Sequence, residues 1–460
     1  MKKSPFSPIL ICLMLSLLVF VFSSCDANPN PEQTTASAST EEWVRPEPVE
    51  AQGLKYSVNA DRKTCTITSI GKCKDVHISI PEFIDGYRVT AIGNYAFKNC
   101  SFLISVILPD SVTSVGKCAF EGCSALRDIL LPSSLQTLGK YTFENCSQLT
   151  NVSLPDSLTW IGTGAFKGCT ALTEITIPAS VTEIEKDIFL KASNLSTVYY
   201  NSSYSSSGND FLNVPAIQKI VFGGETIPEF ICKKCDNLTE IIIEDSVKTI
   251  EGGAFFLCSS LTEITVPDSV LTIGYGAFSF CSSLVNVTLP SELTAIADSA
   301  FQNCSSLTDL VIPDSVISIG MEAFLGCSSL TSIKLPSQLK FIDYGAFRDC
   351  ASLTDITIPE EITEIADNTF KNCVKLTSVI IPESVTAIGS WAFSYTSLKT
   401  IYFNGTKEAW SAVTKKSGWN NGVRNYEIIF ASEDEEDPEE NSSEESSSSE
   451  ASEIAENMEN

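Results

Sequence analysis

The chain has 460 residues, 17 cysteines, one histidine and a formal net charge of −27. This acidic balance argues against a nucleic-acid partner, because binding to phosphates depends on Lys and Arg side chains. A single histidine allows no Ser–His pairing that recurs along the chain, and no phosphate-binding glycine loop or H-E-x-x-H stretch is present. We therefore expect no catalytic site, no cofactor and no metal site.

The first 24 residues are predicted to be a lipoprotein signal peptide. Lys2 and Lys3 supply positive charge, and residues 9–22 form an apolar run of signal-peptide length. The small residues before Cys25 resemble a bacterial lipoprotein cleavage box, in which the Cys25 thiol becomes a thioether to diacylglycerol. The alternatives are an ordinary secretory signal and an uncleaved anchor. No later apolar stretch approaches the ~18 residues that span a bilayer, so we expect a lipid as the only membrane anchor.

The segment after Cys25 is predicted to be a flexible tether, because its Pro, Glu, Ser and Thr residues cannot bury a core. A cap should follow before the repeats begin. It contains His77, and a lone histidine in a cap is more often structural than catalytic. Cys65 and Cys73 in this cap either form a disulfide or stay free, and the sequence leaves both open.

From residue 97 a unit of 23 residues recurs, with the pattern A-F-x-x-C-S-S-L-T-x-I-x-I-P-x-S-V-T-x-I-G. A fixed period of about 20–29 residues with L-x-x-L-x-L is typical of a leucine-rich repeat solenoid, whose units bury their apolar faces by stacking. We predict an α/β repeat fold: a right-handed leucine-rich repeat solenoid with a parallel β-sheet on the concave face, short helical or 3-10 turns elsewhere, and a cap at both ends. The marker phenylalanines are Phe97, Phe120, Phe143, Phe166, Phe189, Phe255, Phe278, Phe301, Phe324, Phe347, Phe370 and Phe393.

One unit shows how a coil is expected to form. Residues 126–131 alternate inward and outward as a short strand does, which places Asp128 and Leu130 on the outside. Pro132 ends the strand because it cannot donate to a ladder. Residues 141–145 are predicted to form one helical or 3-10 turn.

Ten cysteines follow the marker phenylalanine by three residues, and Cys235 occupies the same column in a degenerate repeat. Stacked coils bring such a column into register at about 4.8 Å. Their Cβ vectors run parallel, however, whereas a disulfide needs them to converge. We predict a ladder of buried free thiols and no metal, because the column offers no second type of ligand. The ten are Cys100, Cys123, Cys146, Cys169, Cys258, Cys281, Cys304, Cys327, Cys350 and Cys373.

The regular period fails between Phe189 and Phe255, because the step between these two residues is three residues short of three repeats.

The C-terminus is a Ser/Glu stretch with 13 acids and no Lys or Arg, which predicts a disordered, solvating tail. The predicted segments are 1–24, the signal peptide; 25–52, the lipidated cysteine and tether; 53–96, the N-terminal cap; 97–192, the first run of repeats; 193–238, irregular repeats with a polar loop; 239–396, the second run; 397–430, the C-terminal cap; and 431–460, the acidic tail.

Over roughly residues 54–430 the chain resembles the BspA-like leucine-rich repeat proteins, also called the Treponema pallidum type. Besides the repeat, residues 56–93 look like the family's N-terminal cap, and residues 402–426 with Trp410 and Trp419 look like its closing segment. The resemblance implies a bacterial surface or secreted protein that adheres to host proteins or other cells, without catalytic residues. The irregular repeats and the acidic tail depart from the family pattern.

The outward strand positions, five residues after the cysteine column, are the predicted binding face. Acids there alternate with neutral residues, which either limits repulsion between stacked like charges or forms a mildly acidic, Thr-rich face for basic protein segments. The candidate residues are the acids Asp128, Glu174, Glu240, Glu263, Asp309 and Asp355, with the preceding threonines Thr173, Thr262, Thr308 and Thr354.

These observations predict a lipid-anchored protein of the bacterial cell envelope, exposed at the cell surface, whose solenoid binds proteins or other extracellular macromolecules. The alternative is a structural envelope or matrix protein without a discrete ligand. Asp26 directly follows Cys25. Such an acid retains lipoproteins at the inner membrane of some bacteria, so the sequence leaves the membrane of residence open.

Overall fold

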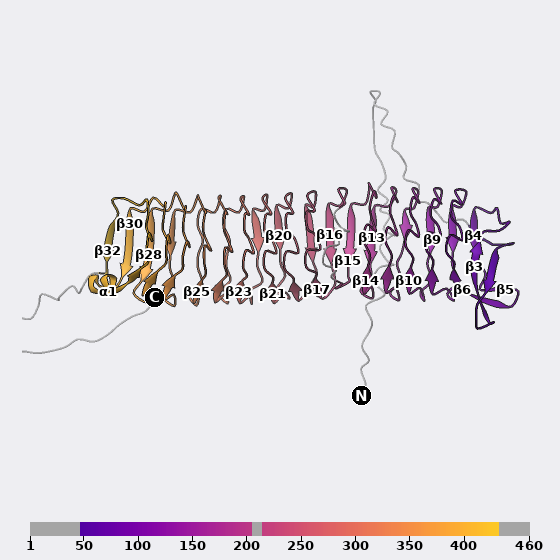
Figure 1. Ribbon diagram of the computed structural model, residues 1–460, viewed down its shortest axis with the longest axis horizontal. Helices are drawn as coiled ribbons and strands as arrows, with labels where there is room; N and C mark the ends of the chain where they lie inside the picture. Colours follow the sequence, from indigo (N-terminus) through magenta and orange to yellow (C-terminus); the bar gives the residue numbers. More distant parts are fainter. Residues whose placement is uncertain (1–46, 205–213, 432–460) are drawn as a thin grey trace, which may run out of the picture. The chain divides into compact units, whose positions relative to one another are not determined.

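The computed structural model describes residues 47–204 and 214–431. The predictions for the signal peptide, Cys25, most of the tether and nearly all of the acidic tail lie outside these residues. The described chain forms a β-solenoid of about 16 turns spaced ~23 residues apart, with parallel strands (Figure 1). The predicted leucine-rich repeat solenoid is therefore confirmed.

The first row of strands coincides with the predicted strand of most repeats; the repeats of Asp309 and Ser332 have only the isolated bridge Val311–Lys334 there. We call the outward surface of this row the strand face. Neighbouring strands of this row pair in parallel, and they belong to several separate short sheets. The strands are β1 (Val49–Glu50), β4 (His77–Ser79), β7 (Ser105–Ile107), β9 (Asp128–Leu130), β11 (Asn151–Val152), β13 (Glu174–Ile177), β15 (Thr197–Tyr200), β16 (Lys219–Phe222), β18 (Glu240–Ile243), β20 (Glu263–Thr265), β22 (Asn286–Thr288), β26 (Asp355–Thr357), β28 (Ser378–Pro382), β30 (Thr400–Asn404) and β32 (Glu427–Phe430).

A second row of strands, absent from the sequence-based expectation, follows the turn in most coils. From β8 to β29 each strand of this row has two residues, and one apolar residue of each, such as Leu138, points into the core. Only the N-terminal pairs β2–β3 and β5–β6 are antiparallel among the described strands. The second row comprises β2 (Lys55–Val58), β3 (Thr64–Ser69), β5 (Phe83–Ile84), β6 (Tyr87–Ile92), β8 (Ser114–Val115), β10 (Thr137–Leu138), β12 (Trp160–Ile161), β14 (Glu183–Ile184), β17 (Thr226–Ile227), β19 (Thr249–Ile250), β21 (Thr272–Ile273), β23 (Ala295–Ile296), β24 (Ser318–Ile319), β25 (Phe341–Ile342), β27 (Glu364–Ile365), β29 (Ala387–Ile388) and β31 (Thr414–Lys415).

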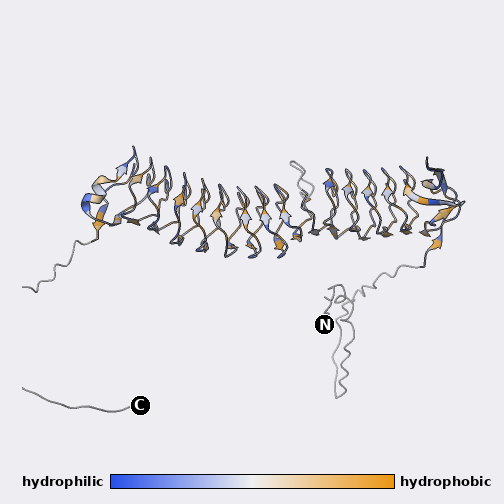
Figure 2. Cartoon of the chain, turned by 90° about the horizontal axis from the view of Figure 1, so that it is seen from below, coloured by the Kyte–Doolittle hydropathy of each residue, from blue (hydrophilic) through white to orange (hydrophobic). Residues whose placement is uncertain are grey.

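The predicted helical turn in each coil is wrong. Tyr141 and Asn145 have φ values of 59° and 60°, which a right-handed helix does not allow. Instead, the N–H groups of Tyr141, Phe143 and Asn145 donate to carbonyls of the next coil at 2.7, 2.8 and 2.7 Å. The third side of the coil is therefore also held to the neighbouring coil by backbone hydrogen bonds. Within the described ranges the single helix is α1 (Lys407–Ala412), at the C-terminal end (Figure 2).

The core is a stack of the marker phenylalanines, all fully buried. The ring centroids of Phe301 and Phe324 lie 5.5 Å apart with planes 5° from parallel. In the irregular repeats the stack is replaced by edge-to-face contacts: Tyr200 meets Phe222 at 6.1 Å, and Phe222 meets Phe255 at 5.9 Å. Aromatic contact therefore joins Tyr200 to the second run of phenylalanines across part of the segment where the period fails.

The cysteine column lies beside this stack, and all its thiols are free and buried, as predicted. Cys304 Sγ donates to the carbonyl of Phe278 at 3.1 Å, and Cys327 Sγ donates to that of Phe301 at 3.2 Å. Each of these thiols therefore ties one coil to the coil before it. The cap cysteines Cys65 and Cys73 are also free, so they do not form a disulfide in this structure.

Burial of these thiols predicts instability at alkaline pH. Desolvation raises the pKa of Cys281 and of Cys327 to about 12, whereas a thiol in an unfolded chain titrates near 8.5. Each thiol's contribution to stability is therefore complete below about pH 8.5 and is lost as the pH rises toward 12. Guanidinium unfolding should show a free energy that falls by about 1.4 kcal/mol per pH unit for each such thiol in this window.

Replacing Cys281 and Cys327 together by alanine should flatten this pH dependence, because the two protons no longer participate. Ser282→Ala, an exposed change next to Cys281, should leave the slope unchanged. An equal slope in the parent and the double cysteine variant would show that the thiols do not titrate differently in the folded state.

Candidate functional site

The strand face carries its first outward side chains in one register. Glu174 lies opposite Thr197, Glu263 opposite Asn286, and Asp355 opposite Ser378. The predicted acids other than Asp128 are exposed, as are the four predicted threonines. The structure therefore places these candidates on one continuous side of the solenoid rather than in a closed pocket.

Asp128 corrects the expectation for this face. It was expected outside, but only 4% of its surface is exposed, and its partner in register, Ser105, is fully buried. The next residue of the column is His77, whose Nδ1 lies 2.9 Å from Ser105 Oγ. Strand alternation sets the side to which a residue points, but not what covers that side. We therefore leave Asp128 out of the candidate surface.

Lys219 is a member of the column that the sequence did not reveal. It lies in β16 between Thr197 and Glu240, and its Nζ is 2.7 Å from Glu240 Oε1. Its repeat lacks the phenylalanine that marked the others, and the alternating strand at residues 219–222 was the only available signal. The pair balances the charge of Glu240, whereas Glu263 has no ion pair within residues 47–204 and 214–431.

Some threonines of this row have structural partners. Thr354 Oγ1 donates to Asp355 Oδ2 at 2.7 Å and lies 3.4 Å from the carbonyl of Thr331. Thr331 and Thr377, which precede serines, donate to the carbonyl one coil earlier, each at 3.3 Å. These three hydroxyls hold neighbouring coils together, and that of Thr354 also orients the carboxylate of Asp355.

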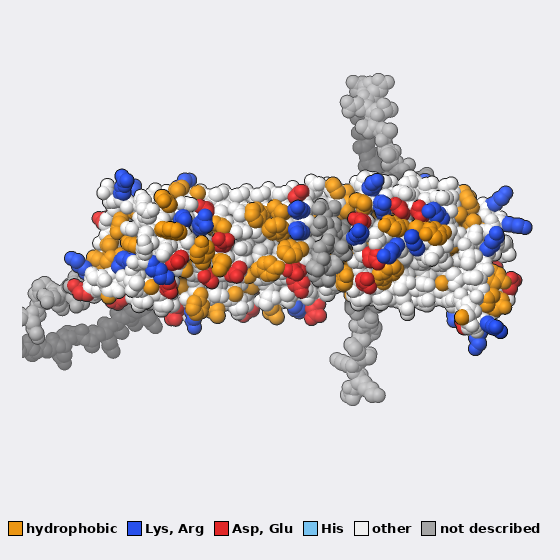
Figure 3. All heavy atoms as spheres, in the orientation of Figure 1, with side chains coloured by type: hydrophobic (Ala, Val, Ile, Leu, Met, Phe, Trp, Pro, Cys, Tyr) orange, Lys and Arg blue, Asp and Glu red, His pale blue; other side chains and the backbone are white. Residues whose placement is uncertain are grey.

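A second outward column lies two residues further along each strand and includes apolar side chains. Ile242 is 39% exposed and Val311 is 81% exposed, and Tyr199 and Tyr402 are also exposed. Figure 3 shows apolar side chains lying among acidic and basic ones along the solenoid. The strand face therefore combines negative charge with apolar contact area, a combination that single scattered surface residues do not provide.

Two grooves hollow this face where the first-row ladder is interrupted. The first, of about 450 Å³, lies across β18 and β20, which belong to different sheets. The second, of about 910 Å³, lies between the coil of Lys334 and β26. The first is lined in part by Glu240, Ile242, Glu263, Thr265, Asn286 and Thr288, and the second by Asp314, Lys334, Asp355, Thr357, Glu360 and Glu361.

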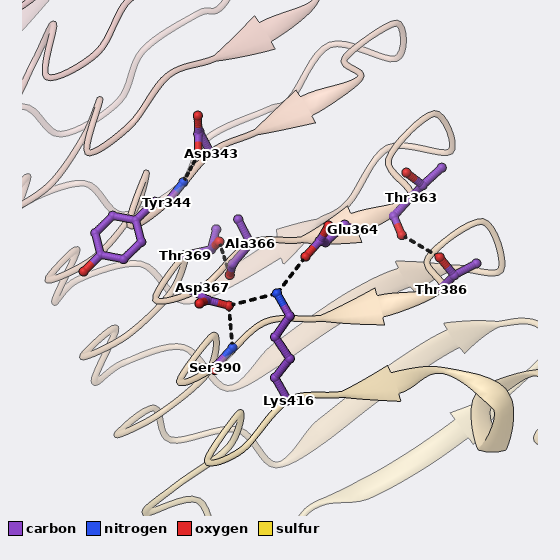
Figure 4. A network of polar contacts seen from close by, with 10 residues as sticks. All are labelled: Asp343, Tyr344, Thr363, Glu364, Ala366, Asp367, Thr369, Thr386, Ser390 and Lys416. Carbon is purple, nitrogen blue, oxygen red and sulfur yellow. Dashed lines mark hydrogen bonds and ion pairs between the residues drawn. The ribbon is translucent and has the colours of Figure 1, made fainter.

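Polar side chains elsewhere support the fold. At the C-terminal end Lys416 Nζ lies 3.2 Å from Glu364 Oε1 and 3.4 Å from Asp367 Oδ1, and Asp367 also accepts the N–H of Ser390 at 2.8 Å (Figure 4). This network ties the closing segment to the last coils. No cluster of three His, Cys, Asp or Glu side chains suited to a metal occurs in the part of the chain that the structure describes.

The same part of the chain has no helix that is both long and apolar enough to cross a bilayer.

Comparison with known proteins gives one family and several structural neighbours. The sequence profile described as "BspA type Leucine rich repeat region (6 copies)" matches residues 90–216, 225–320 and 294–412. A leucine-rich repeat protein from Bacteroides ovatus is 26% identical, with a TM-score of 0.58, over 83% of this chain and 98% of its own. A leucine rich cell surface protein from Faecalibacterium prausnitzii is 29% identical, with a TM-score of 0.35, over 81% and 99%. A leucine-rich repeat protein of T. pallidum is 22% identical, with a TM-score of 0.22, over 67% and 91%. No curated protein matches the chain.

Proposed function

Because the chain belongs to the BspA-type leucine-rich repeat family, we propose that it is a bacterial cell-surface protein anchored by a lipid on Cys25. Its solenoid binds proteins or other macromolecules outside the cell, and it acts by adhesion rather than catalysis. The observation that carries this proposal is the strand face, where acids and apolar side chains surround the groove across β18 and β20.

The stacked scaffold makes this face a suitable recognition surface. Its strand side chains are fixed at regular spacing because neighbouring coils share backbone hydrogen bonds on three sides. A partner therefore meets preorganised groups and loses little free energy in ordering them. Extended solenoid surfaces of this kind commonly bind macromolecules.

The charges on the face define the chemistry of the partner. Glu263, Asp309 and Asp355 are exposed and have no ion pair among residues 47–204 and 214–431, so Lys or Arg side chains of a partner can pair with them. Ile242 and Val311 offer apolar contact beside these acids. The partner is a polypeptide segment that carries basic and apolar side chains in alternation.

Lipid attachment is tested on Cys25 itself. Cells that express the protein and are fed a radiolabelled fatty acid should label the parent but not Cys25→Ala, because the thiol is the proposed site of the thioether. The variant should also leave the detergent phase in a phase-partition assay. A Cys25→Ala protein that still takes up label and still partitions into detergent would contradict the anchor.

Recognition by the strand face is tested by replacing Glu263, Asp309 and Asp355 with serine. Binding to an immobilised peptide of alternating lysine and leucine should weaken, and its association rate should fall with salt, because exposed charges are screened beyond about 8 Å at physiological ionic strength. Thermal stability should change by no more than about 0.5 kcal/mol, as is usual for exposed positions.

The matched control replaces three exposed acids outside this surface, Glu183, Glu225 and Glu408, with serine. It changes the net charge equally and should retain the binding of the parent. If the strand-face variant binds as well as this control, the acids form only a solvated surface, and the alternative of an envelope protein without a discrete ligand gains support.

A further inference from the structure

The N-terminal end of the solenoid carries a concentration of positive charge in an otherwise acidic protein. We define the N-terminal end face as the surface of residues 53–74, which contains β2, the outermost strand of its sheet. Figure 3 shows Lys and Arg side chains gathered at this end. Its five bases are all exposed: Lys55, Arg62, Lys63, Lys72 and Lys74.

The backbone places these bases in two groups. Lys55 begins β2 opposite Ser69, and the N–H of Lys72 donates to the carbonyl of Gly53 at 3.1 Å, which brings Lys72 to the same end of the hairpin. Arg62 and Lys63 lie in the turn at the other end of β2. The four residues of this strand separate the two groups by roughly 13 Å.

The acids of this end are fewer than its bases: residues 53–74 hold one acid, Asp61, against five bases, which leaves an excess of four positive charges. Asp61 accepts the N–H groups of Lys63 and Thr64, both at 2.9 Å, and these bonds lower its pKa. Asp85 accepts the hydroxyl of Tyr56 at 2.6 Å. None of the five bases has an ion pair with any residue that the structure describes.

The other acids of the cap, Asp75, Glu82 and Asp85, lie outside residues 53–74. Glu82 forms an ion pair with Arg88 at 2.8 Å, and Asp75 Oδ2 lies 3.7 Å from Cys73 Sγ. The positive charge of the end face is therefore available to an external anionic partner.

We propose that the N-terminal end face binds the anionic phospholipid headgroups of the membrane in which the protein is anchored. This inference rests on the proposed function, because the lipid on Cys25 is what would bring the protein to that membrane. The described chain begins at this same end, at β1 (Val49–Glu50), which makes the end face the part of the solenoid nearest in sequence to the proposed lipid on Cys25. Lys and Arg side chains near an anionic bilayer are attracted to its surface.

The charge of the rest of the protein fixes the orientation of binding. The strand face carries the exposed acids Glu174, Glu263, Asp309 and Asp355, so an anionic surface repels the strand face and attracts the end face. Val58, which is exposed on β2 between the two basic groups, adds apolar contact at the headgroup level. The solenoid then stands on its N-terminal end, and the strand face remains accessible to a partner from the side.

The test uses a chain that lacks residues 1–25, because the compact unit begins at Arg45 and every described residue is retained. This chain has no lipid, so its result is independent of whether Cys25 is modified. Co-sedimentation should show at least about tenfold tighter binding to vesicles of phosphatidylglycerol and phosphatidylcholine than to phosphatidylcholine alone. Salt at ~0.5 M should abolish the difference.

Replacing all five end-face bases with glutamine should remove the preference for anionic vesicles. The matched control replaces five other exposed lysines, Lys186, Lys191, Lys340, Lys375 and Lys399, with glutamine. Both variants change the net charge equally, so the control should retain binding if position rather than total charge matters. Circular dichroism and thermal unfolding verify that both remain folded.

Three outcomes would overturn the proposal: no preference of the parent for anionic vesicles, an equal loss in both variants, or binding to soluble polyphosphate without binding to vesicles. The last would assign the end face to an anionic polymer instead of a membrane. None of these outcomes would affect the fatty-acid labelling of Cys25, so failure here and failure of the proposed anchor are distinguishable.

Discussion

Contact between one phenylalanine ring and the next is the interaction on which the rest of this solenoid depends. From Phe278 to Phe347 successive centroids lie 5.3–5.5 Å apart, with planes within 8° of parallel. A single coil cannot bury such a ring, because the adjacent coils supply the surfaces on both sides of it. The thiol–carbonyl bonds of the cysteine column and the backbone bonds between coils all require this stacking.

The same constraint organises the candidate site. When each coil repeats the position of the last, a residue type recurring every 23 residues becomes a column on the surface, as Glu263 and Asn286 show. Where first-row pairing stops, between β18 and β20, the core and the second row continue and the face opens into a groove. Regular stacking therefore supplies the rigid surface, and its local interruptions supply the shape that a partner can recognise.

The period alone predicted the coil, the buried phenylalanines and the free thiols, because these follow from the repetition of residues with fixed inward positions. Other features depend on what one coil meets in three dimensions. The turn at Tyr141 is held in a left-handed conformation by bonds to the next coil, which a propensity for helical turns does not reveal. The burial of Asp128 and the pairing of Lys219 with Glu240 likewise depend on neighbours that the repeat pattern does not specify.

Hydrogen exchange in a Phe301→Ala protein tests most directly whether stacking holds the solenoid together. Loss of a fully buried phenylalanine costs about 3–5 kcal/mol. We expect protection to fall in the coil of Phe301 and in both adjacent coils, including the strand-face amides of β22. Val311→Ala, at a position that is 81% exposed, should leave the pattern of the parent. Loss of protection confined to residues next to position 301, with the neighbouring coils unchanged, would contradict the account.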